Sequence, residues 1–252
     1  MLYRLNDVYI GRSLETYGEM GELEARVLCG LVAPGDVAIE VGANIGTNAI
    51  PLAKRLGPQG RLLAFEPQRQ VHQMLCANVA LNGLSNVMTF WAAAGAEPGA
   101  ITVPVLDYDS QNNFGGVSLG AHDKGERVPV MTIDSLRLAA CRLIKIDVEG
   151  MEFEVLQGAG DTIGRLRPRL YLENDRREKS AALIAHVTAL GYRCYWHLPP
   201  LYNPDNFRNH QQDIFGRIVS VNMLCLPDDD PLDVSSLRQV SGPDDDWKRP
   251  AT

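Results

Sequence analysis

The strongest constraint on the fold is an alternation along the chain. From about residue 22 to 196, short apolar runs of β type alternate with segments whose apolar residues recur at the helical period. Helices that cross over between neighbouring strands of one sheet make those strands parallel, so the alternation predicts a doubly wound α/β fold with a mostly parallel sheet. The predicted parallel strands lie in DVAIEVGA, GRLLAFEP, NVMTFWAAA, CRLIKID and RPRLYLEN.

Three segments depart from this alternation. The last two apolar runs, YRCYWHL and IVSVNMLCL, are expected to pair antiparallel at one edge of the sheet. Between Gly95 and Arg142, β-type pieces without a helix make an unusually long connection, and we expect residues 96–130 to be an insertion that serves as a lid. Residues 227–252 hold seven Asp and are interrupted by Pro, which predicts a mobile acidic tail behind a single domain of residues 1–226.

Composition argues against several classes of partner and compartment. The chain carries a formal charge of -7 without a cluster of Lys and Arg, so it lacks the positive surface that binds nucleic acid. No stretch approaches the roughly 18 apolar residues of a membrane span, and the N-terminus has no continuous apolar run, so we expect no membrane association and no export signal. The five cysteines are far apart without a CxxC pair, which indicates free thiols and a cytoplasmic protein.

A glycine turn follows the first predicted strand. In EVGANIGTN the strand runs into a turn that opens a helix, which lets a ligand approach bare backbone and helix N–H groups. Counting from Gly42, the remaining glycine positions of a GxGxxG dinucleotide motif hold Asn44 and Thr47, which disfavours an NAD(P) oxidoreductase. The carboxylate of Glu40 repels a pyrophosphate but can pair with an ammonium group, so the ligand is expected to carry a cationic amine.

A second acid stands at the end of the next predicted strand. Glu66 lies 20 residues beyond Gly46, directly before Pro67, which is expected to open a helix. A carboxylate at this place in a doubly wound fold accepts hydrogen bonds from both ribose hydroxyls, although an isolated Glu there also fits an ordinary exposed residue. Together with the turn, Glu66 predicts a ligand that combines an amine, a carboxylate and a ribose. S-adenosylmethionine (SAM) is such a ligand.

Longer stretches extend this pattern: VGANIGTNAIPLA, LLAFEPQRQVHQMLCANVALNGL, IKIDVEGMEFEVLQGA, and YLENDR with the later YWHLPPLYNPDNF and SVNMLCLP. In them, over about residues 9–226, the chain resembles the FkbM-type methyltransferases. The resemblance implies a Rossmann-like fold of the class I methyltransferase type, with SAM as cofactor and S-adenosylhomocysteine (SAH) as product. It also implies methyl transfer to an oxygen of a natural product or carbohydrate, so the acceptor is expected to be a small molecule or a glycan.

The resemblance further implies which residues touch the cofactor. In similar proteins the glycine turn holds the methionine part, the acid at the second strand holds the ribose, and the backbone after the third strand lines the adenine. Tyr17 and Glu19 resemble an entry segment that closes over the cofactor, although a core Tyr and a helix-start Glu explain them equally well. The predicted cofactor-binding residues are Tyr17, Glu19, Glu40, Gly42, Ala43, Asn44, Gly46, Thr47, Glu66, Pro67, Ala92, Ala93 and Asp147.

Polar side chains follow the fourth and fifth parallel strands and a later strand, at the strand ends where open α/β sheets bind ligands. Asp147, Glu173 and His197 are the predicted catalytic residues. Asp147, Glu173 and Asn174 resemble the ligand set of metal-dependent catechol-type O-methyltransferases, which implies a Mg²⁺ ion that lowers the pKa of the acceptor hydroxyl. Two alternatives stay open: a metal-free general base among the catalytic candidates, or structural roles in which Glu149 caps a helix and Glu173 and Asn174 turn the chain.

The predicted insertion bears on the acceptor. Residues 106–116 bring acids, amides and rings next to two glycines, which suits a polyhydroxylated acceptor, although a plain polar turn explains them as well. The sequence therefore predicts a SAM-dependent O-methyltransferase that acts on a hydroxyl of a sugar or natural product. The alternative is a non-catalytic protein of the same fold that binds SAM or a nucleoside. The oligomeric state stays open, a homodimer included.

Overall fold

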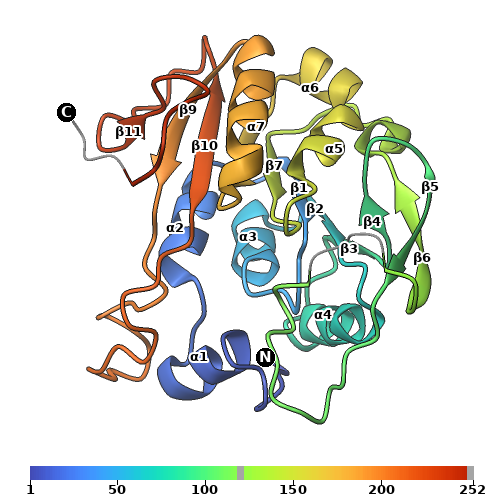
Figure 1. Cartoon of the computed structure of the whole chain (residues 1–252), viewed down its shortest axis with the longest axis vertical. Helices are drawn as coiled ribbons and strands as arrows, with labels where there is room; N and C mark the ends of the chain where they lie inside the picture. The colour runs from blue at the N-terminus through green and yellow to red at the C-terminus, as the bar shows by residue number, and fades with distance from the viewer. Residues whose placement is uncertain (118–121, 249–252) are drawn as a thin grey trace.

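A computed structural model describes residues 1–117 and 122–248 of the chain (Figure 1). Its helices are α1 (Ile10–Tyr17), α2 (Glu22–Gly30), α3 (Ala49–Leu56), α4 (Arg69–Leu81), α5 (Glu152–Gln157), α6 (Gly160–Leu166) and α7 (Arg177–Ala189), with a 3-10 turn, η1 (Ile133–Leu136). Its strands are β1 (Val37–Val41), β2 (Arg61–Phe65), β3 (Val87–Phe90), β4 (Ala93–Ala94), β5 (Gly99–Val103), β6 (Glu126–Met131), β7 (Leu143–Ile146), β8 (Arg169–Glu173), β9 (Tyr192–His197), β10 (Asn222–Pro227) and β11 (Arg238–Gln239).

The main sheet has the strand order β11-β9-β10-β8-β7-β1-β2-β3. The five strands from β8 to β3 are parallel, whereas β10 runs antiparallel to both β8 and β9. The doubly wound parallel sheet and its antiparallel edge pair are therefore confirmed. The order reverses direction at β1, so the carboxyl ends of β1, β2, β7 and β8 meet at a topological switch point, where such folds bind ligands.

Apolar side chains cover both faces of this sheet, because neighbouring residues of a strand point to opposite sides. On β1, Ile39 and Val41 join a core that includes side chains of α5, α6 and α7. Ala38 precedes Ile39 and points to the opposite face, where it joins a second core with side chains of α2, α3 and α4. The two helical layers leave only the strand ends open, and this confines the polar residues after the strands to one edge of the sheet.

The predicted third strand divides in two. β3 ends at Phe90, and Ala93–Ala94 leave the main sheet as β4 to pair with β6, which pairs in turn with β5. This small sheet lies on the side of the molecule opposite β11 (Figure 1). The insertion is thus partly a β-structure of its own. Of the expected piece NFGGVSL, residues 113–117 form no strand, and the remainder falls within 118–121, outside the described residues.

The C-terminal segment differs from the expected mobile tail. Residues 228–248 pack against the sheet edge, where β11 pairs with β9. Arg169 forms an ion pair with Asp230, and Asp245 accepts hydrogen bonds from Trp196 and Arg238. The structure thus places 228–248 against the domain, with Asp230 and Asp245 bonded to residues of the sheet, whereas the Asp-rich composition predicts a mobile tail; residues 249–252 lie outside the described part.

None of the helices in the described ranges is long and apolar enough to cross a membrane.

Candidate functional site

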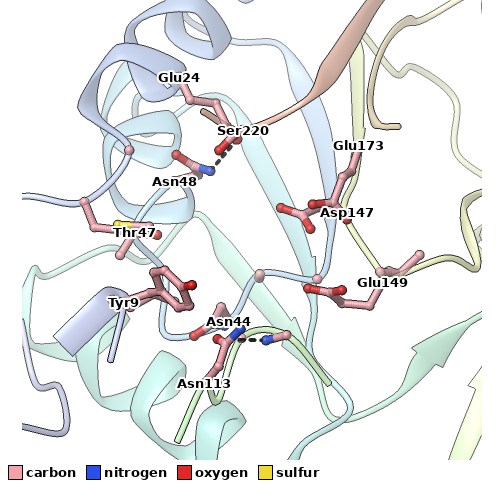
Figure 2. Close-up of a pocket in the computed structure, with 18 of the residues that line it drawn as sticks. Tyr9, Glu24, Asn44, Thr47, Asn48, Asn113, Asp147, Glu149, Glu173 and Ser220 are labelled. Carbon is pink, nitrogen blue, oxygen red and sulfur yellow. Dashed lines mark hydrogen bonds between the residues drawn. The ribbon is translucent and has the colours of Figure 1, made fainter. Parts of the chain in front are cut away.

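A cavity of about 490 Å³ lies at the switch point, within the size range of small-molecule sites. Figure 2 shows Asp147 and Glu173 together on one side of it, with Tyr9 and Thr47 opposite and Asn44 beside Asn113. The polar residues that line the cavity are Tyr9, Glu24, Glu40, Asn44, Thr47, Asn48, Glu66, Gln68, Asn113, Lys145, Asp147, Glu149, Glu173, Asp175, Arg176 and Ser220. The carboxylic acids among these outnumber the cations, so the cavity favours a positively charged ligand.

The turn after β1 brings its backbone against the cavity. Gly42 has φ 83°, and a Cβ there would lie 1.8 Å from the carbonyl oxygen of Asp147, so the close contact of the β1 and β7 ends requires glycine. Gly42, Ala43, Asn44 and Thr47 line the cavity as predicted. Gly46 does not; its φ is 95°, and its open side packs against Leu75 in the core. Gly46 therefore shapes the turn instead of meeting a ligand.

Glu66 closes the turn from the end of β2. Its Oε2 accepts a hydrogen bond from the backbone N–H of Asn44, and its Oε1 accepts one from the N–H of Gln68. Burial raises the pKa of Glu66 to about 7, against the opposing effect of these two N–H groups. Each oxygen retains a lone pair, so the carboxylate can still accept two ribose hydroxyls. Pro67 lies beside it in the cavity wall, as predicted.

A buried lysine links three acidic side chains that line the cavity. Lys145 is 2% exposed, and its Nζ lies 2.9 Å from Asp147 Oδ2, 3.7 Å from Glu24 Oε1 and 3.9 Å from Glu40 Oε1. Burial alone lowers the pKa of Lys145, but the three carboxylates outweigh it and raise that pKa above its ordinary value. The ammonium group is therefore permanent at neutral pH, and it holds Asp147 at the cavity wall.

Glu24 and Glu40 share this ammonium group and are themselves fully buried. Asn48 and Asn222 donate hydrogen bonds to Glu24, whereas Glu40 Oε2 has no hydrogen-bond partner among the described residues. Burial raises the pKa of Glu40 to about 8, and the charge of Glu24 adds to the effect while Lys145 opposes it. An unpaired buried carboxyl oxygen is costly, so this corner of the cavity is prepared for a cationic or hydrogen-bond-donating group.

Asp147 and Glu173 lie together on one side of the cavity (Figure 2). The side chain of Asp147 is 36% exposed and paired with Lys145. Burial raises the pKa of Glu173 to about 11, with the neighbouring charge of Asp147 as the next cause, so Glu173 is protonated at neutral pH. The Asp147 side chain, held by Lys145, and the protonated Glu173 thus lie side by side at the cavity.

Glu149 also points into the cavity (Figure 2), and its backbone is strained at φ 55°. Its carboxylate pairs with Arg176, while burial and the charge of Asp147 raise its pKa to about 7. Glu149 does not take the expected capping role, because α5 begins without a side-chain cap; Glu152 Oε1 accepts instead from the N–H groups of Val148 and Gly150 in the preceding loop. Glu149 is therefore free to act at the cavity.

Two chain segments that are distant in sequence roof the cavity. The N-terminal segment pairs with the insertion, because the N–H of Val8 donates to Asn112 O and the N–H of Asn112 donates to Asn6 O. The insertion continues as residues 113–117, of which Asn113, Gly115, Gly116 and Val117 line the cavity. The predicted contribution of the insertion to the site agrees with this placement.

Tyr17 and Glu19 do not line the cavity. The Tyr17 hydroxyl donates to Gln212 O and accepts from the N–H of Ile214, and Glu19 accepts from the Asn203 amide and the N–H of Phe207. Both residues hold the connection between β9 and β10, whose residues 218–221 do line the cavity. The predicted direct contact with the cofactor is therefore replaced by support of a cavity wall.

Three more predicted residues lie outside the cavity. Ala92 and Ala93 are buried in apolar clusters after β3 ends, and they are not among the residues that line the cavity. His197 has its Nδ1 2.7 Å from the Tyr171 hydroxyl, and burial lowers its pKa. His197 does not line the cavity and its Nδ1 already has Tyr171 as a partner, so the structure does not place it where the predicted catalytic base would act.

The predicted metal site does not form. The Asn174 side chain is buried and its amide contacts Met223 Sδ, away from the cavity, while the Lys145 ammonium already occupies the position of a cation beside Asp147. Within residues 1–117 and 122–248, no three His, Cys, Asp or Glu side chains are grouped to hold a metal ion. The donor set therefore does not fit Mg²⁺.

Sequence reasoning missed Lys145, Glu24, Asn48, Tyr9 and Ser220, which all line the cavity. A signal existed for Lys145: it stands two residues before Asp147, as Glu40 stands two before Gly42, and parallel pairing places Lys145 beside Glu40. The others reach the site from α1, α2, α3 and the β9–β10 connection, whose approach depends on tertiary packing.

Comparison with known proteins agrees with this geometry. The family model described as "Methyltransferase FkbM domain" matches residues 40–194, more than half of the chain. The chain belongs to the FkbM methyltransferase family. The matched range begins at Glu40 and contains the turn, Glu66, Lys145, Asp147 and Glu173. No curated protein matches the sequence.

Solved structures show the fold of this family member to be that of class I methyltransferases. It is similar to the methyltransferase FkbM from Methylobacillus flagellatus KT, at 19% identity and a TM-score of 0.52, over 77% of this chain and 45% of that protein. It is also similar to the precorrin 8w decarboxylase of Methanobacterium thermoautotrophicum, at 12% identity and a TM-score of 0.51, over 90% of this chain and 99% of that one. The chain thus spans less than half the length of the Methylobacillus protein.

Proposed function

We propose that this chain binds SAM in the switch-point cavity and transfers its methyl group to a hydroxyl oxygen of a small sugar-like or natural-product acceptor. The observation that carries the proposal is the joint placement of the glycine turn, Glu66 and the Lys145–Asp147 pair around one cavity. Gly42 to Asn44 and Thr47 would hold the methionine part, with Glu40 near its ammonium group. Glu66 would accept the ribose hydroxyls. When bound, SAM supplies an electrophilic methyl group on a sulfonium sulfur.

The residues of the chain then have to align and deprotonate the acceptor. Asp147 is the general base of this proposal, because its side chain is partly exposed and is held at the cavity by Lys145. It accepts the hydroxyl proton as the new O–C bond forms and the S–C bond breaks. Glu173 is protonated beside it and can donate a hydrogen bond to the acceptor.

Neutral polar side chains support a hydroxylated acceptor. Asn48, Asn113 and Ser220 line the cavity on different sides, and amide and hydroxyl groups match alcohols as both donors and acceptors. An acceptor that carries a phosphate group is disfavoured, because the carboxylate of Asp147 would repel it. The favoured acceptor class is therefore a neutral or basic polyhydroxylated molecule.

The proposal is tested with the purified full chain in two steps. Isothermal titration calorimetry with SAM and SAH measures binding, and we expect Glu66→Gln to weaken it by at least about tenfold, because one amide oxygen cannot replace both carboxylate oxygens. Glu97→Gln, at an exposed position, is the matched control and is expected to bind like the parent. Transfer of labelled methyl from SAM to a panel of sugars and hydroxylated natural products then separates an enzyme from a binding protein. Absence of SAM binding by the parent chain refutes the proposal.

A further inference from the structure

Gln68 has a buried side-chain amide whose nitrogen has a hydrogen-bond partner and whose oxygen has none among the described residues. Its side chain lines the cavity and is 6% exposed. Its Nε2 donates a 2.8 Å hydrogen bond to the carbonyl oxygen of Phe114, whereas its Oε1 is buried without a hydrogen-bond partner among the described residues. A buried acceptor left unpaired costs more than an ordinary hydrogen bond contributes, so a partner for Oε1 is expected from whatever fills the cavity.

The orientation of this amide is fixed by its surroundings. The carbonyl of Phe114 can only accept, so the amide nitrogen faces it and the oxygen faces away. Phe114 is itself anchored, because it is buried and its ring stacks on Tyr108 with a centroid distance of 5.0 Å. Gln68 therefore offers an acceptor, and not a donor, to a ligand.

The surroundings of Gln68 are narrow. Pro67 lines one side, and Gly115 and Gly116 belong to the roof. A Cβ on Gly115 would lie 3.0 Å from Asn44 Nδ2, and one on Gly116 would lie 2.3 Å from Asn113 Nδ2, so side chains there would crowd this end of the cavity. Pro67 precedes Gln68 in the chain, and Gly115 follows Phe114, to whose carbonyl Gln68 is bonded, so residues without long side chains flank this amide in the cavity wall. Gln68 lies two residues after Glu66, so a ribose held by Glu66 would bring its attached base near this part of the wall.

We propose that Gln68 Oε1 accepts a hydrogen bond from the exocyclic amino group of the adenine and thereby makes the site select an adenosyl over an inosyl ligand. The inference rests on the proposed function, because it takes the ribose to be held by Glu66. Hypoxanthine carries a carbonyl oxygen where adenine carries its amino group, so an inosyl ligand sets oxygen against oxygen at Gln68. The site then loses a hydrogen bond and gains a repulsion.

The test compares two ligands that differ at that one group. Calorimetry on the full chain measures the dissociation constants of SAH and of S-inosylhomocysteine, and we expect the parent protein to bind SAH at least about tenfold more tightly. Gln68→Met has a similar volume and no acceptor, and it is expected to bring the two constants within about twofold of each other, mainly by weakening SAH. Gln73→Met makes the same change on the exposed side of α4 and should keep the parent preference.

Each outcome decides a separate point. Equal binding of the two ligands by the parent protein overturns the inference and leaves the proposed function standing, since SAH still binds. A preference that persists in Gln68→Met assigns the selection to another residue and overturns it as well. Gln68→Glu retains an acceptor oxygen, so it should keep the preference even if the Met variant does not fold, and loss of the preference there counts against the inference. No SAH binding by the parent protein refutes the proposed function itself.

Discussion

Two regions of the molecule bury ion pairs, and they do so in opposite ways. Behind the sheet edge, Arg169 donates from Nε and Nη2 to the two oxygens of Asp230, at 2.9 Å each, and from Nη1 to the carbonyl of Leu31. At the cavity, the single ammonium group of Lys145 serves Asp147, Glu24 and Glu40 at increasing distances. In the first arrangement each charged group has its own partner, whereas in the second three carboxyl groups share one cation.

The difference separates structure from function. A bidentate, fully bonded pair gains geometric specificity and leaves no polar group unpaired, which suits the attachment of the C-terminal segment. A buried carboxyl oxygen without a hydrogen-bond partner, such as Oε2 of Glu40, is tolerated only where another group supplies that partner. In the cavity, a cationic ligand can supply it.

The largest effect is expected at the cavity. Asp147→Asn removes the proposed base without changing the size of the side chain, so kcat for methyl transfer should fall by about 10²–10⁴-fold while SAM still binds. The measurement is labelled methyl transfer to an acceptor found in the panel, with calorimetry of SAM in parallel. Asp161→Asn, on the exposed surface of α6, is the control and should keep full activity. Retained kcat in Asp147→Asn shows that another group takes the proton.

The opposite pattern is expected at the sheet edge. Asp230→Ala leaves the guanidinium of Arg169, which is 7% exposed, without its carboxylate, and should lower the free energy of unfolding by about 3–5 kcal/mol. Urea denaturation measures this loss, and Asp229→Ala at the exposed neighbouring position should stay near the parent value. Because Asp230 does not line the cavity, the dissociation constant of SAM should not change in the folded variant. A stability equal to the parent would remove the structural half of the contrast.

The sequence is sufficient for the parallel sheet, the antiparallel edge pair and the turn with Glu66, because these depend on local periodicity and on acids at strand ends. It misplaces the C-terminal segment, because an Asp-rich run reads as solvated until its partners are known, and Asp230 and Arg169 lie 61 residues apart. Lys145 escapes notice for a related reason. A lysine inside an apolar strand only interrupts the hydrophobic pattern, and its function becomes visible when the structure shows the carboxylates that surround it.

Other misplacements come from tertiary packing. Tyr17 and Glu19 carry functional-looking side chains, but the connection between β9 and β10 folds back onto them and takes up their hydrogen-bonding groups. Ala92 and Ala93 lie where the chain changes sheets, a step that no local pattern predicts. Glu24 reaches the site because α2 packs beside α3. Such contacts depend on how layers stack and not on any motif.

The third prediction concerns pH. The pKa of Glu40 is about 8 in the folded chain and ordinarily 4.5, so between these values the unfolded chain releases a proton that the folded chain retains. Rising pH therefore favours unfolding, by at most ~1.4 kcal/mol per pH unit from this group. Glu40→Gln cannot ionise and should lack this loss between pH 5 and 8 in denaturation curves, whereas Glu97→Gln should retain it. Parallel curves for Glu40→Gln and the parent would mean that Glu40 is already ionised beside Lys145.

The smallest effect is expected at Glu149, whose left-handed backbone at φ 55° costs about 1 kcal/mol that a glycine avoids. Glu149→Gly should therefore unfold with a free energy about 1 kcal/mol higher than Glu149→Gln, which loses the same charge but keeps the strain. Arg137, at φ 49° and away from the cavity, provides the matched pair Arg137→Gly and Arg137→Gln, and the same gain is expected there. Only the Glu149 variants should lower methyl transfer, because only there does the strained backbone aim a side chain into the cavity. If both glycine variants gain stability and the Glu149 variants keep full methyl transfer, the strain at Glu149 belongs to the loop geometry alone. Glu149 would then have a purely structural role, like the ion pair at the sheet edge.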